Sequence, residues 1–157
     1  MSADLQSLIL KLALSSGSHG LGIDQDGSPS LIVDGGLEVH FQRGDDEQSL
    51  VLLACVGTLP HGGQGEAALR GLRWLAEANY EWLGGDGFTL CCEPESYEVL
   101  LAGRFTLAAL SADPFPEPLA RFIDAGRHWS DLLGALARVE ALRPVTPARR
   151  QSAMARA

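Results

Sequence analysis

The chain has 157 residues, of which 46% are hydrophobic and 20% are charged, and its formal net charge is −8. This length and composition are typical of one globular domain that buries a sizeable core. The acidic balance argues against a nucleic-acid partner, because neutralising phosphates requires a basic surface.

Charge is distributed unevenly along the chain. Residues 144–157 contain Arg149, Arg150 and Arg156 and no acidic residue, which leaves a charge of −11 on residues 1–143. We expect residues 1–143 to form a single domain. Residues 144–157 show no apolar period, so we expect them to be a disordered basic tail. An acidic body of this kind suits a partner of basic character.

Cysteine use and hydropathy indicate the compartment. The chain has three cysteines, and two of them are adjacent, which indicates a reducing environment rather than a disulfide framework. The first residues lack a positively charged signal region, and no stretch reaches the ~18 apolar residues that span a bilayer. We therefore expect a cytoplasmic protein that does not insert into a membrane.

The first predicted helix covers residues 3–14 and has two apolar faces. Leu5, Leu8, Ile9 and Leu12 share one face at helical spacing, whereas Leu10 and Leu14 lie on another face. Either both faces are buried in the core, or one packs on a sheet while the other borders a groove.

The hydrophobic pattern that follows predicts five strands and two further helices. The predicted strands are residues 31–33, 37–42, 50–56, 88–92 and 97–101, and the predicted helices begin near residues 66 and 119. The resulting order is α-β-β-β-α-β-β-α. Hairpin-linked strands between helices indicate an α+β two-layer domain with a twisted antiparallel sheet, rather than a doubly wound parallel sheet.

The middle helix, residues 66–83, has more apolar surface than one face requires. Two neighbouring stripes carry it, one formed by Leu69, Leu72, Ala76 and Leu83 and the other by Ala68, Leu75 and Trp82. So wide an apolar arc has to be covered on two sides. We expect its own sheet to cover one side and a second copy of the chain to cover the other.

The last predicted helix has a single, regular apolar face. This face consists of Leu119, Phe122, Ile123, Gly126, Trp129, Leu133 and Leu136. The repeated prolines of residues 114–118 cannot propagate a helix and stiffen the approach to it.

The sequence offers little for catalysis. The four histidines are scattered with no two at metal-ligand spacing, and Cys91 and Cys92, as neighbours in a strand, point to opposite faces. A nucleophile pair of Cys92 with His61 is one arrangement to consider, but buried inert thiols are commoner than reactive ones. The glycine turn at residues 84–87 precedes a strand and therefore lacks the helix N-terminus that holds phosphate. We expect no enzyme activity, no cofactor and no metal.

Four stretches together resemble the small acidic chaperones of type III secretion systems, in the class dedicated to effector proteins. They are the leucine helix followed by Leu21-Gly22-Ile23-Asp24, the apolar strand 50–56 leading to Ala78-Asn79-Tyr80, the strand start Phe88-Thr89-Leu90, and the run Phe-Ile-Asp-Ala-Gly-Arg-His-Trp at 122–129. The likeness covers residues 3–138. The chain departs from it in residues 114–118 and in the basic tail.

The resemblance implies a homodimer that holds the N-terminal segment of a secreted effector, its client, soluble and extended without ATP. It also implies the secretion ATPase as a partner. The client-binding residues it suggests are Leu5, Leu8, Leu12, Leu31, Val33, Val39 and Phe41, each of which is otherwise simple core. The dimer residues it suggests are Leu72, Leu75, Trp82 and Phe88.

Two other interpretations remain open at this point. One is a stand-alone ligand-binding or regulatory domain with a similar two-layer fold. The other is a thiol-dependent enzyme that uses Cys91 or Cys92.

Overall fold

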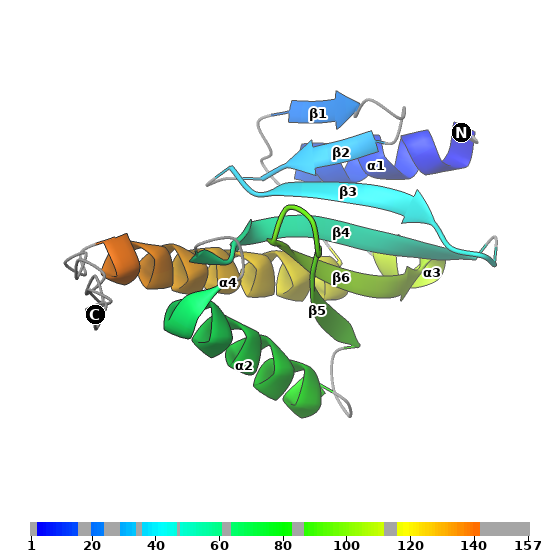
Figure 1. Cartoon of the computed structure of the whole chain (residues 1–157). Coiled ribbons are helices and arrows are strands. Elements are labelled where there is room, and N and C mark those ends of the chain that lie inside the picture. The colour runs from blue at the N-terminus through cyan, green and yellow to red at the C-terminus, as the bar shows by residue number, and fades with distance from the viewer. Residues whose placement is uncertain are drawn as a thin grey trace, which may run out of the picture.

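A computed structural model describes residues 3–15, 20–23, 29–33, 36–46, 48–60, 64–82, 87–111 and 116–141. The elements, in chain order, are α1 (Ala3–Ser15), β1 (Gly20–Ile23), β2 (Pro29–Ile32), β3 (Glu38–Arg43), β4 (Ser49–Thr58), α2 (Gly65–Trp82), β5 (Phe88–Cys92), β6 (Glu98–Thr106), α3 (Leu107–Leu110) and α4 (Glu117–Ala141) (Figure 1). The predicted basic tail lies outside the described residues.

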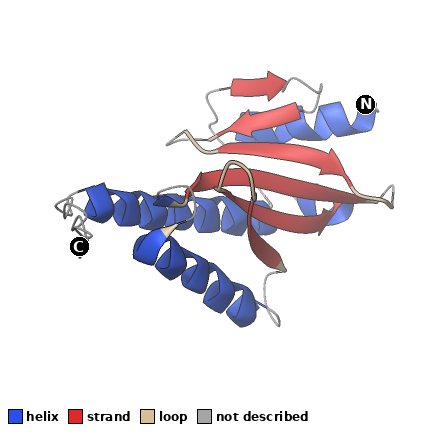
Figure 2. Ribbon diagram, viewed as in Figure 1, coloured by secondary structure: helices blue, strands red, loops and turns tan. Residues whose placement is uncertain are grey.

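The strands form one antiparallel sheet of six strands in the order β1-β2-β3-β4-β6-β5. Helices α1, α3 and α4 lie behind this sheet in Figure 2, and α2 lies beside β5. The other face of the sheet, which we call the open face, points toward the viewer. The predicted α+β class is therefore confirmed.

The predicted element order needs two additions. β1 falls in a stretch for which no strand was predicted, and the short helix α3 follows β6. β1 was missed because its glycines give no strand pattern, whereas its pairing with β2, from Gly20 with Ile32 to Ile23 with Pro29, is a tertiary contact. β6 also runs five residues beyond the prediction, since β4 extends along it as far as the Ser49–Thr106 pair.

The core lies between the sheet and the helices. Alternate residues of β3, β4 and β6 face it, as the period-two pattern predicts. All seven residues predicted for the face of α4 are buried. The rings of Phe88 and Phe105 each lie against that of Phe122, at centroid distances of 5.5 and 6.0 Å, and so join both strands to α4.

Close backbone approach sets the helix positions at two glycines. A Cβ on Gly71 of α2 would lie 2.6 Å from Cδ2 of Leu59, and one on Gly126 of α4 would lie 2.7 Å from Cδ2 of Leu37. Glycine at these positions lets both helices approach their neighbours more closely than any other residue would.

Candidate functional site

Five of the predicted client-binding residues are part of the core of a single chain. Leu12, Leu31, Val33, Val39 and Phe41 are each at most 3% exposed. Their side chains fill the space between α1, the first strands and the rest of the core, so the core-packing alternative holds for them. A client cannot reach these side chains without opening the fold.

The accessible apolar face of α1 is the opposite one. Leu10 is 50% exposed and Leu14 is 79% exposed, while Leu8 is half-buried against the core. The side chain of Leu5 lies outside the described part of the chain. The four-residue spacing of Leu10 and Leu14 was the available signal for this face, but spacing alone does not tell which of two apolar faces points to solvent.

Helix α2 also has one buried and one exposed apolar face. Ala67, Ala68, Gly71 and Leu75 are buried against the protein's own elements. A second stripe, which we call the outer face of α2, is exposed and consists of Leu69, Leu72, Ala76 and Tyr80. Contiguous exposed apolar side chains of this kind mark interaction surfaces.

The predicted dimer residues, which come from α2 and β5, differ in exposure. Leu72 is 39% exposed on the outer face, whereas Leu75 and Phe88 are 4% and 5% exposed and pack within their own chain. The side chain of Trp82 is not among those described. Of the three described residues, only Leu72 is exposed.

A side-chain clamp fixes α2 against β5. The amide nitrogen of Asn79 donates to the carbonyl of Leu90 at 2.9 Å, and the Leu90 N–H donates to the Asn79 side-chain oxygen at 2.8 Å. Both hydrogen bonds are partly buried, so they hold the helix in register with the edge strand. The outer face of α2 therefore stands at a defined angle to the rest of the domain.

The two exposed helix faces belong to opposite edges of the sheet. β1 and β5 are the edge strands. α1 contacts β1 and β2, and α2 contacts β5 and α4 (Figure 1). An edge strand offers unpaired backbone groups to an added strand, so the β1 edge combines backbone and apolar contacts for a partner. At the β5 edge the backbone groups of Leu90 already pair with Asn79, so the exposed apolar face of α2 is the main contact surface there.

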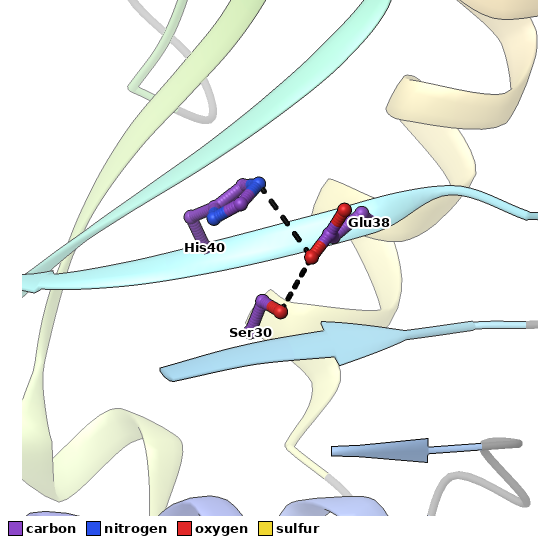
Figure 3. Close-up of polar contacts among 3 residues, drawn as sticks. All are labelled: Ser30, Glu38 and His40. Atoms are coloured by element: carbon purple, nitrogen blue, oxygen red, sulfur yellow. Dashed lines mark hydrogen bonds and ion pairs between the residues drawn. The ribbon is translucent and has the colours of Figure 1, made fainter. Parts of the chain in front are cut away.

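A polar cluster joins β2 and β3 on the open face, as Figure 3 shows. The Ser30 hydroxyl donates to Oε1 of Glu38 at 2.5 Å, and Nε2 of His40 lies 3.9 Å from the same oxygen. A nucleophilic serine donates its proton to an imidazole, whereas this fully buried hydroxyl donates to a carboxylate. The cluster is best explained as a cross-strand contact that stabilises the β2–β3 pair.

The Cys92 thiol is poorly suited to nucleophilic chemistry. Burial raises the pKa of the Cys92 thiol, and the negative charges of Glu93 and Cys91 raise it further, so the reactive thiolate is disfavoured. His61, the base of the hypothetical pair, lies outside the described residues.

Two further findings concern the described residues alone. No three Cys, His, Asp or Glu side chains among them gather where they could hold a metal ion. No helix among them combines the length and apolarity needed to cross a membrane.

Taken together, the surfaces are those of a protein-binding domain with apolar helix faces at both sheet edges. The model of the Tir chaperone protein (CesT) family matches residues 7–130, so the chain belongs to this family. The resemblance to type III secretion chaperones that the sequence indicates is thereby confirmed.

Solved structures share the fold. A chain in the crystal structure of the ExsC–ExsE complex is 24% identical with a TM-score of 0.54, and the match covers 85% of this chain and 97% of that one. The Yersinia pestis type III secretion chaperone SycH, in complex with a stable fragment of YscM2, is 18% identical with a TM-score of 0.55, over 81% and 97%. The comparison with curated protein sequences found no match.

Proposed function

We propose that this protein is a type III secretion chaperone that binds the N-terminal segment of a secreted effector and keeps it soluble, extended and competent for secretion. The observation that carries the proposal is the family match over residues 7–130. The similar structures of the ExsC–ExsE complex and of SycH with a YscM2 fragment are both complexes of two proteins, which supports the same activity here.

The protein acts as a homodimer through the outer face of α2. Leu69, Leu72 and Tyr80 are 65%, 39% and 77% exposed, so a single chain leaves this stripe in water. A two-fold axis near α2 would bring the same stripe of the second copy against it, as a self-complementary surface requires. The Asn79 clamp to β5 holds each helix ready for that contact.

The client binds at the other end of the sheet, along β1 and the exposed face of α1. An extended segment gains backbone hydrogen bonds by adding to the β1 edge, and its apolar side chains contact Leu10 and Leu14. Ordering a disordered client costs about 2–5 kcal/mol or more, so the wrapped surface has to be large. No nucleotide is needed, because the binding energy alone keeps the segment extended.

The cellular setting follows from this activity. The chaperone works in the bacterial cytoplasm and delivers its client to the secretion ATPase. It catalyses no reaction and needs no cofactor, since a client held by backbone and apolar contacts undergoes no chemical change.

Co-expression with the product of the neighbouring reading frame tests the proposal. The client should co-purify with the unchanged chain and be lost from the double variant Leu10→Gln/Leu14→Gln. Val139→Gln, which changes another exposed apolar side chain on α4, is the matched control and should retain the client. Capture of the client by the Leu10/Leu14 variant at the level of the control would show that the binding surface is elsewhere.

The stand-alone ligand-binding domain remains the alternative. A purified protein of about 16.7 kDa in solution would favour it, since the chaperone interpretation requires two copies.

A further inference from the structure

An open surface pocket of about 320 Å³ lies between α2 and α4, away from both surfaces assigned above. Its lining consists of Trp74, Glu77, Ala78 and Glu81 from α2 and Trp129 and Leu132 from α4, and we call it the tryptophan pocket. Trp74 is half-buried and supplies the accessible indole surface of the pocket, whereas Trp129 is only 5% exposed and belongs to the core beneath it. The two glutamates are exposed at its mouth.

The chemistry of this lining selects a guanidinium group. A cation over an indole face is attracted by the negative face of the ring, and tryptophan is the strongest such partner. A planar guanidinium also stacks on aromatic rings and pairs with carboxylates, which an ammonium does less well. Aromatic walls with carboxylates at the rim therefore match an arginine side chain in both respects.

The charges at the pocket mouth leave one negative charge uncompensated. Nε of Arg73 lies 2.7 Å from Oε1 of Glu77, so that carboxylate already has a guanidinium partner. Glu81 forms no ion pair with any described residue. One added arginine would neutralise the remaining charge and fill the apolar interior.

Such arginines follow α4 in the amino-acid sequence of the same chain. Residues 142–157 contain Arg143, Arg149, Arg150 and Arg156 and no acidic residue. Leu132 in the pocket lies nine residues before Ala141, the end of α4, which is about 14 Å of helix. The seven residues 142–148 can span at most about 23–25 Å, so Arg149 can return to the pocket. Covalent linkage also gives these arginines a high effective concentration there.

We propose that an arginine of residues 142–157 docks in the tryptophan pocket of its own chain, over the accessible part of Trp74 and against Glu81. This contact covers the part of the Trp74 indole that is otherwise open to water. It does not depend on the proposed chaperone function, because neither the outer face of α2 nor the client surface of α1 takes part.

Tryptophan fluorescence of the full-length chain tests the docking. The chain has three tryptophans, so Trp82→Phe leaves only the two pocket residues as reporters. In this background, replacing all four tail arginines by glutamine should raise the acrylamide quenching constant of Trp74 by about twofold, since a stacked guanidinium shields its accessible indole surface. Trp129, at 5% exposure, should be quenched little in either protein. The Trp82→Phe protein with its tail arginines intact is the parent for this comparison. High salt weakens the ion pair with Glu81, so it should raise the quenching constant of the parent toward that of the arginine-to-glutamine variant.

Matched substitutions locate the site. Glu81→Gln should raise the quenching constant as the arginine variant does. Glu95→Gln, an equal charge change in the β5–β6 turn, should leave it unchanged. Equal quenching of the parent and the arginine variant at low salt would refute the proposal. If the protection of the tryptophans from acrylamide disappears on dilution, the docked group comes from another copy of the chain. If the protection appears only when a client segment is added, the docked group comes from the client. Either result overturns docking within one chain.

Discussion

The outer face of α2 allows a direct test of the dimer. We expect the double variant Leu69→Gln/Leu72→Gln to dissociate into folded single chains. Glutamine is close to leucine in length and in helix propensity, so α2 itself should persist. Both side chains are exposed in the single chain, so the substitutions leave its core intact.

The exposed areas give the size of the effect. Leu69 and Leu72 are 65% and 39% exposed, which together amounts to about one whole leucine side chain per copy. Fully burying a leucine contributes about 1.5–3 kcal/mol, so two copies contribute about 3–6 kcal/mol to the dimer. Because about 1.4 kcal/mol corresponds to a factor of ten, the dissociation constant should rise about 10²- to 10⁴-fold.

Sedimentation equilibrium over a range of concentrations measures this constant. The unchanged protein should have twice the mass of the 16.7 kDa chain, and the double variant should approach the single mass as it is diluted. Val139→Gln, at a 58% exposed site on α4, should keep the mass of the unchanged protein. A double variant that stays dimeric, with an unaltered dissociation constant, would refute the assignment of the interface to this face.

Two further predictions concern the stability of the single chain and are checked by urea unfolding. Asn79→Ala should lower the free energy of unfolding by about 1–3 kcal/mol, because it leaves both backbone groups of Leu90 without their partner; an unchanged midpoint would show that the clamp is not needed. Gly57→Ala should lower it by about 1–3 kcal/mol, since Gly57 has a φ of +148° and a Cβ there would lie 3.2 Å from Leu133. Gly134→Ala in α4 is the control and should be neutral or stabilising by up to about 1 kcal/mol, so equal losses in both variants would contradict the reasoning.

Local patterns in the sequence were sufficient for most elements. The seven apolar positions of α4 recur at helical spacing and are all buried. β5 begins and ends at the predicted residues, 88 and 92. Both elements pack one regular face on a single layer, so hydrophobic periodicity carries nearly all the information about them.

Pairing between distant segments explains the elements that were missed. β1 has the sequence Gly-Leu-Gly-Ile, which contains no strand signal of its own and is ordered by its neighbour β2. The last five residues of β6 are likewise ordered along β4, which is more than forty residues earlier in the chain. Strand propensity depends on such context, so no local window could have predicted them.

The same distinction applies to the binding surfaces. The sequence alone determined that α1 and α2 each have two apolar faces, that the body is acidic, and that four stretches resemble the type III secretion chaperones, a likeness that the family match bears out. Only the tertiary structure decided that α1 buries Leu12 and exposes Leu14, and that α2 buries Leu75 and exposes Leu72. Periodicity gives the angle between two faces of a helix, whereas the choice of the buried face depends on where the sheet lies, and that position is set by the packing of the whole chain.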